Sequence, residues 1–224
     1  MAIQRNSSLF KTITDAIEVH SKPLSYVLVF CLGGFILMCA HKMWVTHTDR
    51  AAQYDFSALM TEYEITAREK NPEWEDLLEK FETNYAKHSR SSLLPYYLSY
   101  KARILLNQNK KNEALTVLDV MISSLVGSPL RNLYETERSL VQLDMEDESL
   151  QTTGLEALKK LAYDTTNNYR DTAQFYLGRY YWANDEIESA RQVWQKLVDE
   201  QRDEKMAPSP WIHYVQSKLD VTIV

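Results

Sequence analysis

The fold is decided by residues 171–197, DTAQFYLGRYYWANDEIESARQVWQKL. Apolar and small residues recur here at intervals of three and four, which is the period of one face of an α-helix, and the polar residues 184–186 interrupt the pattern once. The segment predicts two antiparallel helices, 170–183 and 187–201, joined by a short turn. Gly178 and Ala190 would let such helices approach closely, and Tyr181 and Trp194 would fill the space beside them.

The same segment resembles a tetratricopeptide repeat. Five residues stand at the spacing of the Leu-Gly, Tyr, Ala and aromatic positions of that repeat: Leu177, Gly178, Tyr181, Ala190 and Trp194. The sequence departs from the pattern at its opening, where Gln174 replaces the expected Trp, and no Pro closes the unit. The resemblance implies a helical hairpin that stacks on neighbouring hairpins.

Two weaker copies precede this unit. In the first, four residues lie 76 positions before Gly178, Tyr181, Ala190 and Trp194: Ala102, Leu105, Ala114 and Leu118. Between the two copies, Ala157 and Leu161 mark a degenerate third copy. We expect the residues by which this copy exceeds the usual repeat length to lie in the acidic turn 146–149. Three stacked hairpins suffice for a short solenoid. The alternative is an ordinary helical bundle with small residues at these places by accident.

The rest of the body has the same helical period, and the whole chain contains only five glycines. We therefore expect an all-α fold, with further helices at 50–70, 72–88, 92–108, 111–125, 129–145, 150–163 and 210–220. Asn71 followed by Pro72 predicts an N-cap and first helical residue, and Ser209 followed by Pro210 repeats this pattern.

An uncharged run, LSYVLVFCLGGFILMCA, occupies residues 24–40. Extended past Lys42 to Val45, it would rise about 33 Å as a helix, which is enough to cross a hydrocarbon core of about 30 Å. We expect a transmembrane helix at 24–45. A cleaved signal peptide and a buried helix of a soluble protein are the alternatives, and the first lacks a suitable cleavage site.

Small residues within the run suggest how it packs. Gly33 and Gly34 could admit a close neighbouring helix, although they lack the four-residue spacing of the strong dimer motif. Both cysteines of the chain, Cys31 and Cys39, lie in the same run, so the body has no disulfide framework. We expect both cysteines to be packing or lipid-facing residues.

The head, residues 1–23, carries one apolar stripe. Leu9, Phe10, Ile13 and Ile17 share one side of an expected amphipathic helix at 8–19, which would rest on the membrane surface or dock on a partner. Three basic residues lie in the head and two follow the run. This bias places the head in the cytoplasm and the body, residues 46–224, on the other side.

The charge of the body excludes some functions. Residues 51–224 contain 20 basic and 28 acidic side chains. An acidic surface does not neutralise phosphates, so nucleic-acid binding and attachment to anionic lipid are disfavoured. Its size and its aromatic content are those of a folded domain rather than of a disordered stalk.

Both ends of the chain are similar to a known family. The N-terminal stretch KPLSYVLVFCLGGFILMCAHKMWVTHTDRAAQYDFSALM, 22–60, and the tail ARQVWQKLVDEQRDEKMAPSPWIHYVQSKLD, 190–220, resemble the bacterial YfgM family. The middle third departs from it. The resemblance implies a single-pass inner-membrane protein with a cytoplasmic N-terminus and a periplasmic repeat domain. Its partners would be the SecYEG translocon, a membrane-anchored foldase, and emerging or unfolded chains.

An enzyme is the weakest hypothesis. The five histidines form no HExxH or other tight ligand set, and the sequence contains neither a Gly-rich phosphate loop nor a G-x-S-x-G elbow. We therefore expect no catalytic residues, no metal and no cofactor. An interaction module is favoured, and a structural scaffold of another envelope complex, of cell division or secretion, is the alternative.

The resemblance to tetratricopeptide repeats also predicts a binding groove, formed by the second, fifth, ninth and twelfth positions of each unit. In two units these positions hold Tyr96, Ser99, Arg103 and Leu106, and Thr172, Phe175, Arg179 and Trp182. Arg recurs at the ninth place and would meet carboxylates or carbonyls of an extended chain. The alternative is that Tyr96 and Phe175 are core residues and that both arginines pair with local Glu.

Overall fold

The computed structural model describes residues 3–200 and 209–220, with side chains for 32–44, 46–200 and 209–220. The chain divides into two compact units, Met1–Asp55 and Phe56–Val224. The second unit corresponds to most of the expected repeat domain.

The first unit is a single helical segment. It belongs to α1, Ile3–Thr66, which is continuous through Pro23 and ends in the second unit. The sequence predicts instead a short head helix at 8–19 and a separate span. Pro23 removes one backbone donor from the helix but does not end it. The side chains of the head stripe lie outside the described residues.

Large apolar side chains are exposed on the described part of this unit: Leu32, Phe35, Ile36, Leu37, Met38, Met43 and Trp44. The part of α1 whose side chains are described contains no stretch that is long and apolar enough to cross a membrane. Residues 24–31 and 45 of the expected span lie outside that part. A Cβ added at Gly33 or Gly34 would meet no atom within 4 Å.

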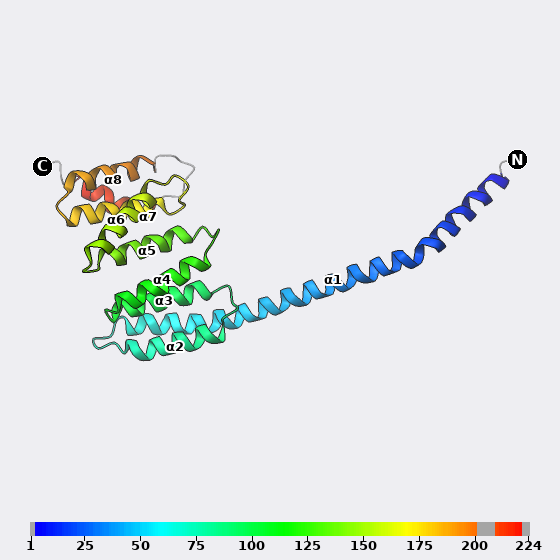
Figure 1. The fold of residues 1–224 in the computed structure, drawn as a ribbon, viewed down its shortest axis with the longest axis horizontal. Coiled ribbons are helices and arrows are strands. Elements are labelled where there is room, and N and C mark those ends of the chain that lie inside the picture. Colours follow the sequence, from blue (N-terminus) through cyan, green and yellow to red (C-terminus); the bar gives the residue numbers. More distant parts are fainter. Residues whose placement is uncertain (1–2, 201–208, 221–224) are drawn as a thin grey trace. The chain divides into compact units, whose positions relative to one another are not determined.

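The described residues of the second unit form helices and turns without strands, as expected. After α1, these residues form eight helices: α2 (Trp74–Lys87), α3 (Leu94–Asn107), α4 (Lys111–Ser124), α5 (Arg131–Leu143), α6 (Glu148–Tyr163), α7 (Arg170–Ala183), α8 (Ile187–Glu200) and α9 (Ile212–Asp220). Helices that follow one another pack as antiparallel hairpins, α3 with α4, α5 with α6 and α7 with α8, and the hairpins stack in sequence order (Figure 1).

A fourth hairpin precedes these three. It consists of residues 56–66 of α1 and the helix α2, and its core contains Phe56, Leu59, Leu77 and Phe81. The Phe56 ring meets the Tyr97 ring of α3 edge-on at 4.9 Å between centroids. The end of α1 is therefore the first helix of the first hairpin.

Two helix starts differ from the prediction. The helix α2 begins at Trp74 with Glu73 as N-cap, so Asn71 and Pro72 precede the helix. The chain leaves α1 through a turn, in which the amides of Arg68 and Glu69 donate to carbonyls three residues back. Asn71 and Pro72 belong to the connection that follows this turn. The helix α9 begins at Ile212, and the Ser209 hydroxyl accepts a hydrogen bond from the Trp211 amide just ahead of it.

The turns inside the first and last of the three hairpins have the same backbone form. Asn109 and Asp185, 76 residues apart, both have positive φ, 61° and 60°. In each turn the next amide reaches back five residues, from Lys110 to the Leu105 carbonyl and from Glu186 to the Tyr181 carbonyl. This is the Schellman geometry that closes a helix, in which Asn and Asp tolerate the left-handed conformation.

The register of the middle copy needs correction. Gly154 and Leu158, rather than Ala157 and Leu161, take the places of Ala190 and Trp194. A Cβ on Gly154 would lie 2.8 Å from the Ser139 carbonyl oxygen, which marks Ser139 as the counterpart of Gly178. Fifteen residues separate Ser139 from Gly154, against twelve between Gly178 and Ala190. The surplus therefore includes the turn 144–147, which overlaps the expected range 146–149 only at the first two residues of that range.

The helix α5 buries three polar side chains, more than either neighbouring first helix. Thr136, Ser139 and Gln142 are buried. Their hydrogen bonds are within the helix: Thr136 and Ser139 donate to carbonyls one turn back, and Gln142 accepts from the Arg138 guanidinium at 3.4 Å. These residues satisfy their polar groups without bonding to a neighbouring helix.

Candidate protein-interaction surface

The first helices of the hairpins, α3, α5 and α7, form the surface on which the binding residues were predicted, and we call it the first-helix face. Neighbouring helices of this face are linked by side chains. The Arg103 guanidinium of α3 donates to the Glu137 carboxylate of α5 at 2.8 Å. The sequence analysis had left open whether this arginine pairs with a local Glu, and in the structure it does.

The electrostatics around Arg103 follow from this pair. Burial lowers the pKa of its guanidinium, the Glu137 carboxylate opposes that effect, and the pKa is raised overall. The guanidinium also lies 5.6 Å from the centre of the Tyr100 ring. The charge of Arg103 is therefore paired with Glu137 of the neighbouring helix.

The other predicted residues of α3 have different environments. Ser99 is buried, and its hydroxyl is hydrogen-bonded to that of Tyr134 on α5. Leu106 is half-buried and packs on the core. Tyr96 is exposed, and its ring lies 6.4 Å from that of Phe56. Of these three residues only Tyr96 is open to solvent.

Three predicted residues of α7 are packed against other side chains, Thr172 and Phe175 against Trp211 just before α9, and Trp182 against Trp194 of α8. Phe175 is buried, and the Trp211 ring stacks on it at 4.1 Å with an interplanar angle of 10°. The Trp211 indole donates to the Thr172 hydroxyl at 3.2 Å. Trp182 stacks on Trp194 at 5.6 Å. Phe175 is thus a core residue, which was the alternative considered from the sequence, and Trp211 and Tyr214 cover it.

Arg179 is exposed, as Arg103 is, but its surroundings differ. Its guanidinium lies over the rings of Phe175 and Tyr176, at 5.8 and 6.0 Å. No carboxylate among the described residues forms an ion pair with it. Cation–π contacts position the side chain and leave its five donors largely available.

Beside Arg179 lies a pocket of about 310 Å3 between α5 and α7, lined by Leu140, Leu143, Asp144, Tyr176, Arg179 and Tyr180. Only Arg179 of these was predicted. With Ser139 as the counterpart of Gly178, Leu140 and Leu143 hold the ninth and twelfth positions of the middle unit. The misplaced register of that unit hid them from the sequence analysis.

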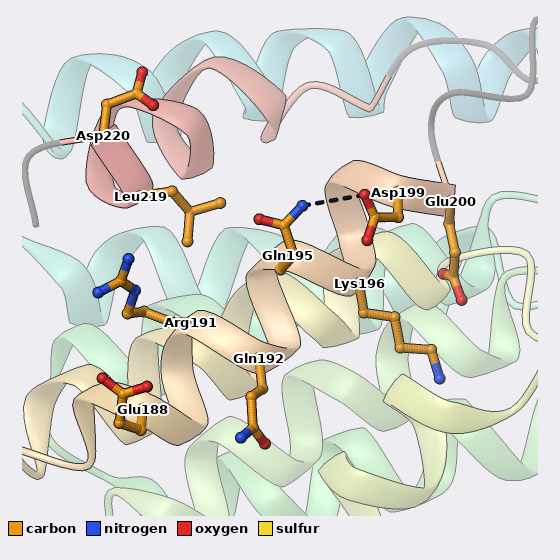
Figure 2. A pocket seen from close by; sticks show the side chains of 9 residues that line it. All are labelled: Glu188, Arg191, Gln192, Gln195, Lys196, Asp199, Glu200, Leu219 and Asp220. Carbon is orange, nitrogen blue, oxygen red and sulfur yellow. Dashed lines mark hydrogen bonds between the residues drawn. The ribbon is translucent and has the colours of Figure 1, made fainter. Parts of the chain in front are cut away.

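Two larger hollows lie outside this face. One, of about 920 Å3, is lined by polar side chains of α8 together with Leu219 and Asp220 of α9, and within it Gln195 donates to Asp199 at 3.1 Å (Figure 2). The other, of about 460 Å3, lies between α4, α5 and α6, and Ala157 lines it. Its Arg131 and Arg138 pair with Glu135 and Asp119. Among the described residues, no group of three His, Cys, Asp or Glu side chains could hold a metal ion.

Taken together, the stacked hairpins, the glycine contacts and the closing helix define a protein of the tetratricopeptide-like helical-repeat class. Two solved structures have this fold: a chain of nearly identical TPR-like repeats from Podosopora anserina, assigned to the kinesin light chains, and a single-residue variant of it. Each is 17% identical to this chain with a TM-score of 0.50, and the match covers 73% of this chain and 84% of that one. No protein-family model and no curated protein sequence matches.

Proposed function

We propose that this chain is a non-catalytic, membrane-anchored module that binds other proteins through the first-helix face. The observation that carries the proposal is the pairing of a helical-repeat unit with an apolar helix. In that helix, large side chains around position 36 are exposed on successive positions, which cover all sides of a helix. A helix that is apolar all round is stable in a hydrocarbon environment.

The binding part of the proposal rests on the repeat fold. Stacked helical hairpins generate an extended surface that proteins of this architecture use for binding. On the first-helix face, an exposed arginine and an apolar pocket lie side by side. Arginine and aromatic residues dominate the energetics of protein interfaces.

The proposed partner is the SecYEG translocon of the bacterial inner membrane, with the N-terminus in the cytoplasm and the repeat domain in the periplasm. A membrane-anchored foldase and emerging or unfolded chains would be its further partners. The support is the resemblance of residues 22–60 and 190–220 to the YfgM family and the acidic, exportable body. A structural scaffold of a division or secretion complex is the second candidate.

Crosslinking in native membranes tests the choice between the two candidates. The full chain, crosslinked before gentle solubilisation and read by mass spectrometry, should yield translocon subunits. Crosslinks confined to division or secretion components would contradict the translocon assignment and favour the scaffold.

A topology measurement tests the anchor. A reporter that is active only outside the cytoplasm, fused after Val224, should be active. As a matched control, the same fusion lacking residues 24–45 should be inactive. A cytoplasmic reporter that is active at the same position would show that the proposed orientation is wrong.

A further inference from the structure

The ninth positions of the three first helices form a row across the first-helix face: Arg103, Leu140 and Arg179. The two arginines have different roles, because the following helix of the face supplies a carboxylate only to the first. Glu137 of α5 meets Arg103 at 2.8 Å. The place on α7 that corresponds to Glu137 on α5 is occupied by Tyr176. Leu140 therefore has a tyrosine, and not a carboxylate, as its neighbour on the next helix. After α7, the next helix on this face is α9. Its Tyr214 packs on Phe175 and supplies no carboxylate to Arg179.

The pocket beside Arg179 joins this charge to apolar surface. Leu140 and Leu143 come from α5, and Tyr176 and Tyr180 come from α7. The one acidic side chain in its lining, Asp144, is held by Lys111 at 2.7 Å, which offsets its charge. The pocket thus presents a cation without an ion-pair partner among the described residues, next to two leucines.

The size of the pocket limits its occupant. About 310 Å3 is at the low end of ligand-sized pockets, so it admits a few side chains of one segment. The body as a whole is acidic, with 20 basic and 28 acidic residues in 51–224, so it has no general attraction for acidic chains. Recognition of a carboxylate at this place depends on Arg179 itself.

We infer that this pocket binds an extended protein segment in which one carboxylate, held by Arg179, is flanked by branched aliphatic side chains that contact Leu140 and Leu143. The inference rests on the proposed function and adds to it the chemistry of the partner. A guanidinium binds a carboxylate through two parallel hydrogen bonds, which gives the contact direction as well as affinity.

The test uses the full chain in mild detergent and a short fluorescein-labelled peptide with Leu-Glu-Leu at its centre and Ser-Gly flanks. Fluorescence anisotropy should show saturable binding to the parent. Arg179→Gln should weaken binding by at least about tenfold, and a Leu-Gln-Leu peptide should bind the parent equally weakly. The two changes together should cost little more than either alone, because both remove the same contact.

Two variants serve as controls. Arg103→Gln should change the affinity less than about twofold, because Glu137 already neutralises that arginine. Arg179→Lys should keep part of the affinity, since it retains the charge but loses the planar fork. Circular dichroism must show equal helix content in all of these proteins for the comparison to hold.

Other results would overturn the inference in distinguishable ways. Equal binding of both peptides, or an equal loss on changing Arg103, would show that Arg179 does not read a carboxylate. Failure of both peptides to bind, with native-membrane crosslinks intact, would remove the inference and leave the proposed function standing. A dimer of this chain that Arg179→Gln dissociates would show that the occupant is a second copy. Absence of both binding and crosslinks would remove the proposed function as well.

Discussion

At the scale of single residues, the closest fit in the fold is between Gly178 and Trp194. The Trp194 indole is fully buried and donates a hydrogen bond to the Phe175 carbonyl at 3.2 Å. A Cβ on Gly178 would lie 2.5 Å from Trp194 Cδ1 and nearer still to Nε1. The sequence predicted the close approach, but it placed the contact at Ala190 rather than at the tryptophan.

We therefore predict that Gly178→Ala destabilises the second unit by about 1 to 3 kcal/mol and that Gly178→Leu does so by more, since a rigid buried ring cannot move aside. Chemical denaturation followed by tryptophan fluorescence measures the change. Gly34→Ala is the matched control, because a Cβ there meets no atom within 4 Å. An unchanged unfolding midpoint for Gly178→Leu would contradict this packing.

A second prediction at this scale concerns alkaline pH. Burial raises the pKa of Tyr134 above its usual value, and the hydrogen bond with Ser99 opposes the rise. A raised folded-state pKa means that the folded protein holds this proton more tightly than the unfolded chain does. Stability is therefore complete below about pH 10, the unfolded value, and falls as the pH rises beyond it.

Tyr134→Phe should make this alkaline loss of stability less steep. At neutral pH it should cost about 1 kcal/mol, because the buried Ser99 loses its partner. Denaturation midpoints across the alkaline range, with tyrosinate absorbance as a second signal, measure both effects. Tyr54→Phe is the control, since that side chain is exposed. Parallel pH profiles for the parent and Tyr134→Phe would count against the assignment.

At the scale of elements, helical periodicity predicted the positions of α3 to α8 to within a few residues. It failed at starts that depend on a turn. Asn71 and Pro72 match the pattern of a helix start, yet they belong to the connection that follows the turn after α1, and α2 begins at Trp74. Propensity describes one residue at a time, whereas the length of a turn is set by the two helices that it joins.

The helix α6 has the strongest cap among the described starts, and the sequence analysis did not single it out. The Asp147 carboxylate accepts hydrogen bonds from the Ser149 and Leu150 amides at 2.8 and 3.3 Å. Asp147→Ala should cost about 1 kcal/mol of folding stability, and Asp147→Asn should cost much less. Urea denaturation measures both, with Glu146→Ala as a neighbouring control. Equal effects of Ala and Asn would contradict the capping role.

At the scale of the whole molecule, the repeat class could be predicted because Gly178, Ala190 and Trp194 keep fixed spacing. The candidate site could be predicted only in part. Arg179 followed from that spacing, but Leu140 and Leu143 did not, because the middle copy carries Ser139 and Gly154 in place of the usual pair. The sequence left the burial of Phe175 open, since this burial depends on where Trp211 and α9 pack.

The closing helix gives a prediction at this scale. Val215 of α9 is fully buried against Trp194 and Leu197. Val215→Asp should place an unpaired charge in that core and cost at least about 3 kcal/mol. Ser217→Asp, on an exposed position of the same helix, is the control. Thermal unfolding of the two variants compares them, and equal midpoints would show that α9 does not close the repeat core.

The polar side chains buried in α5 have a consequence for local opening. Thr136, Ser139 and Gln142 bond within their own helix, so their burial adds little apolar surface to the contacts of α5, which lies between two hydrophobic clusters. In a linear array each hairpin is held by its neighbours alone, so such a seam can separate before either side unfolds. Native-state hydrogen exchange should therefore show two cooperative blocks, one on each side of α5, each of which protects its own amides.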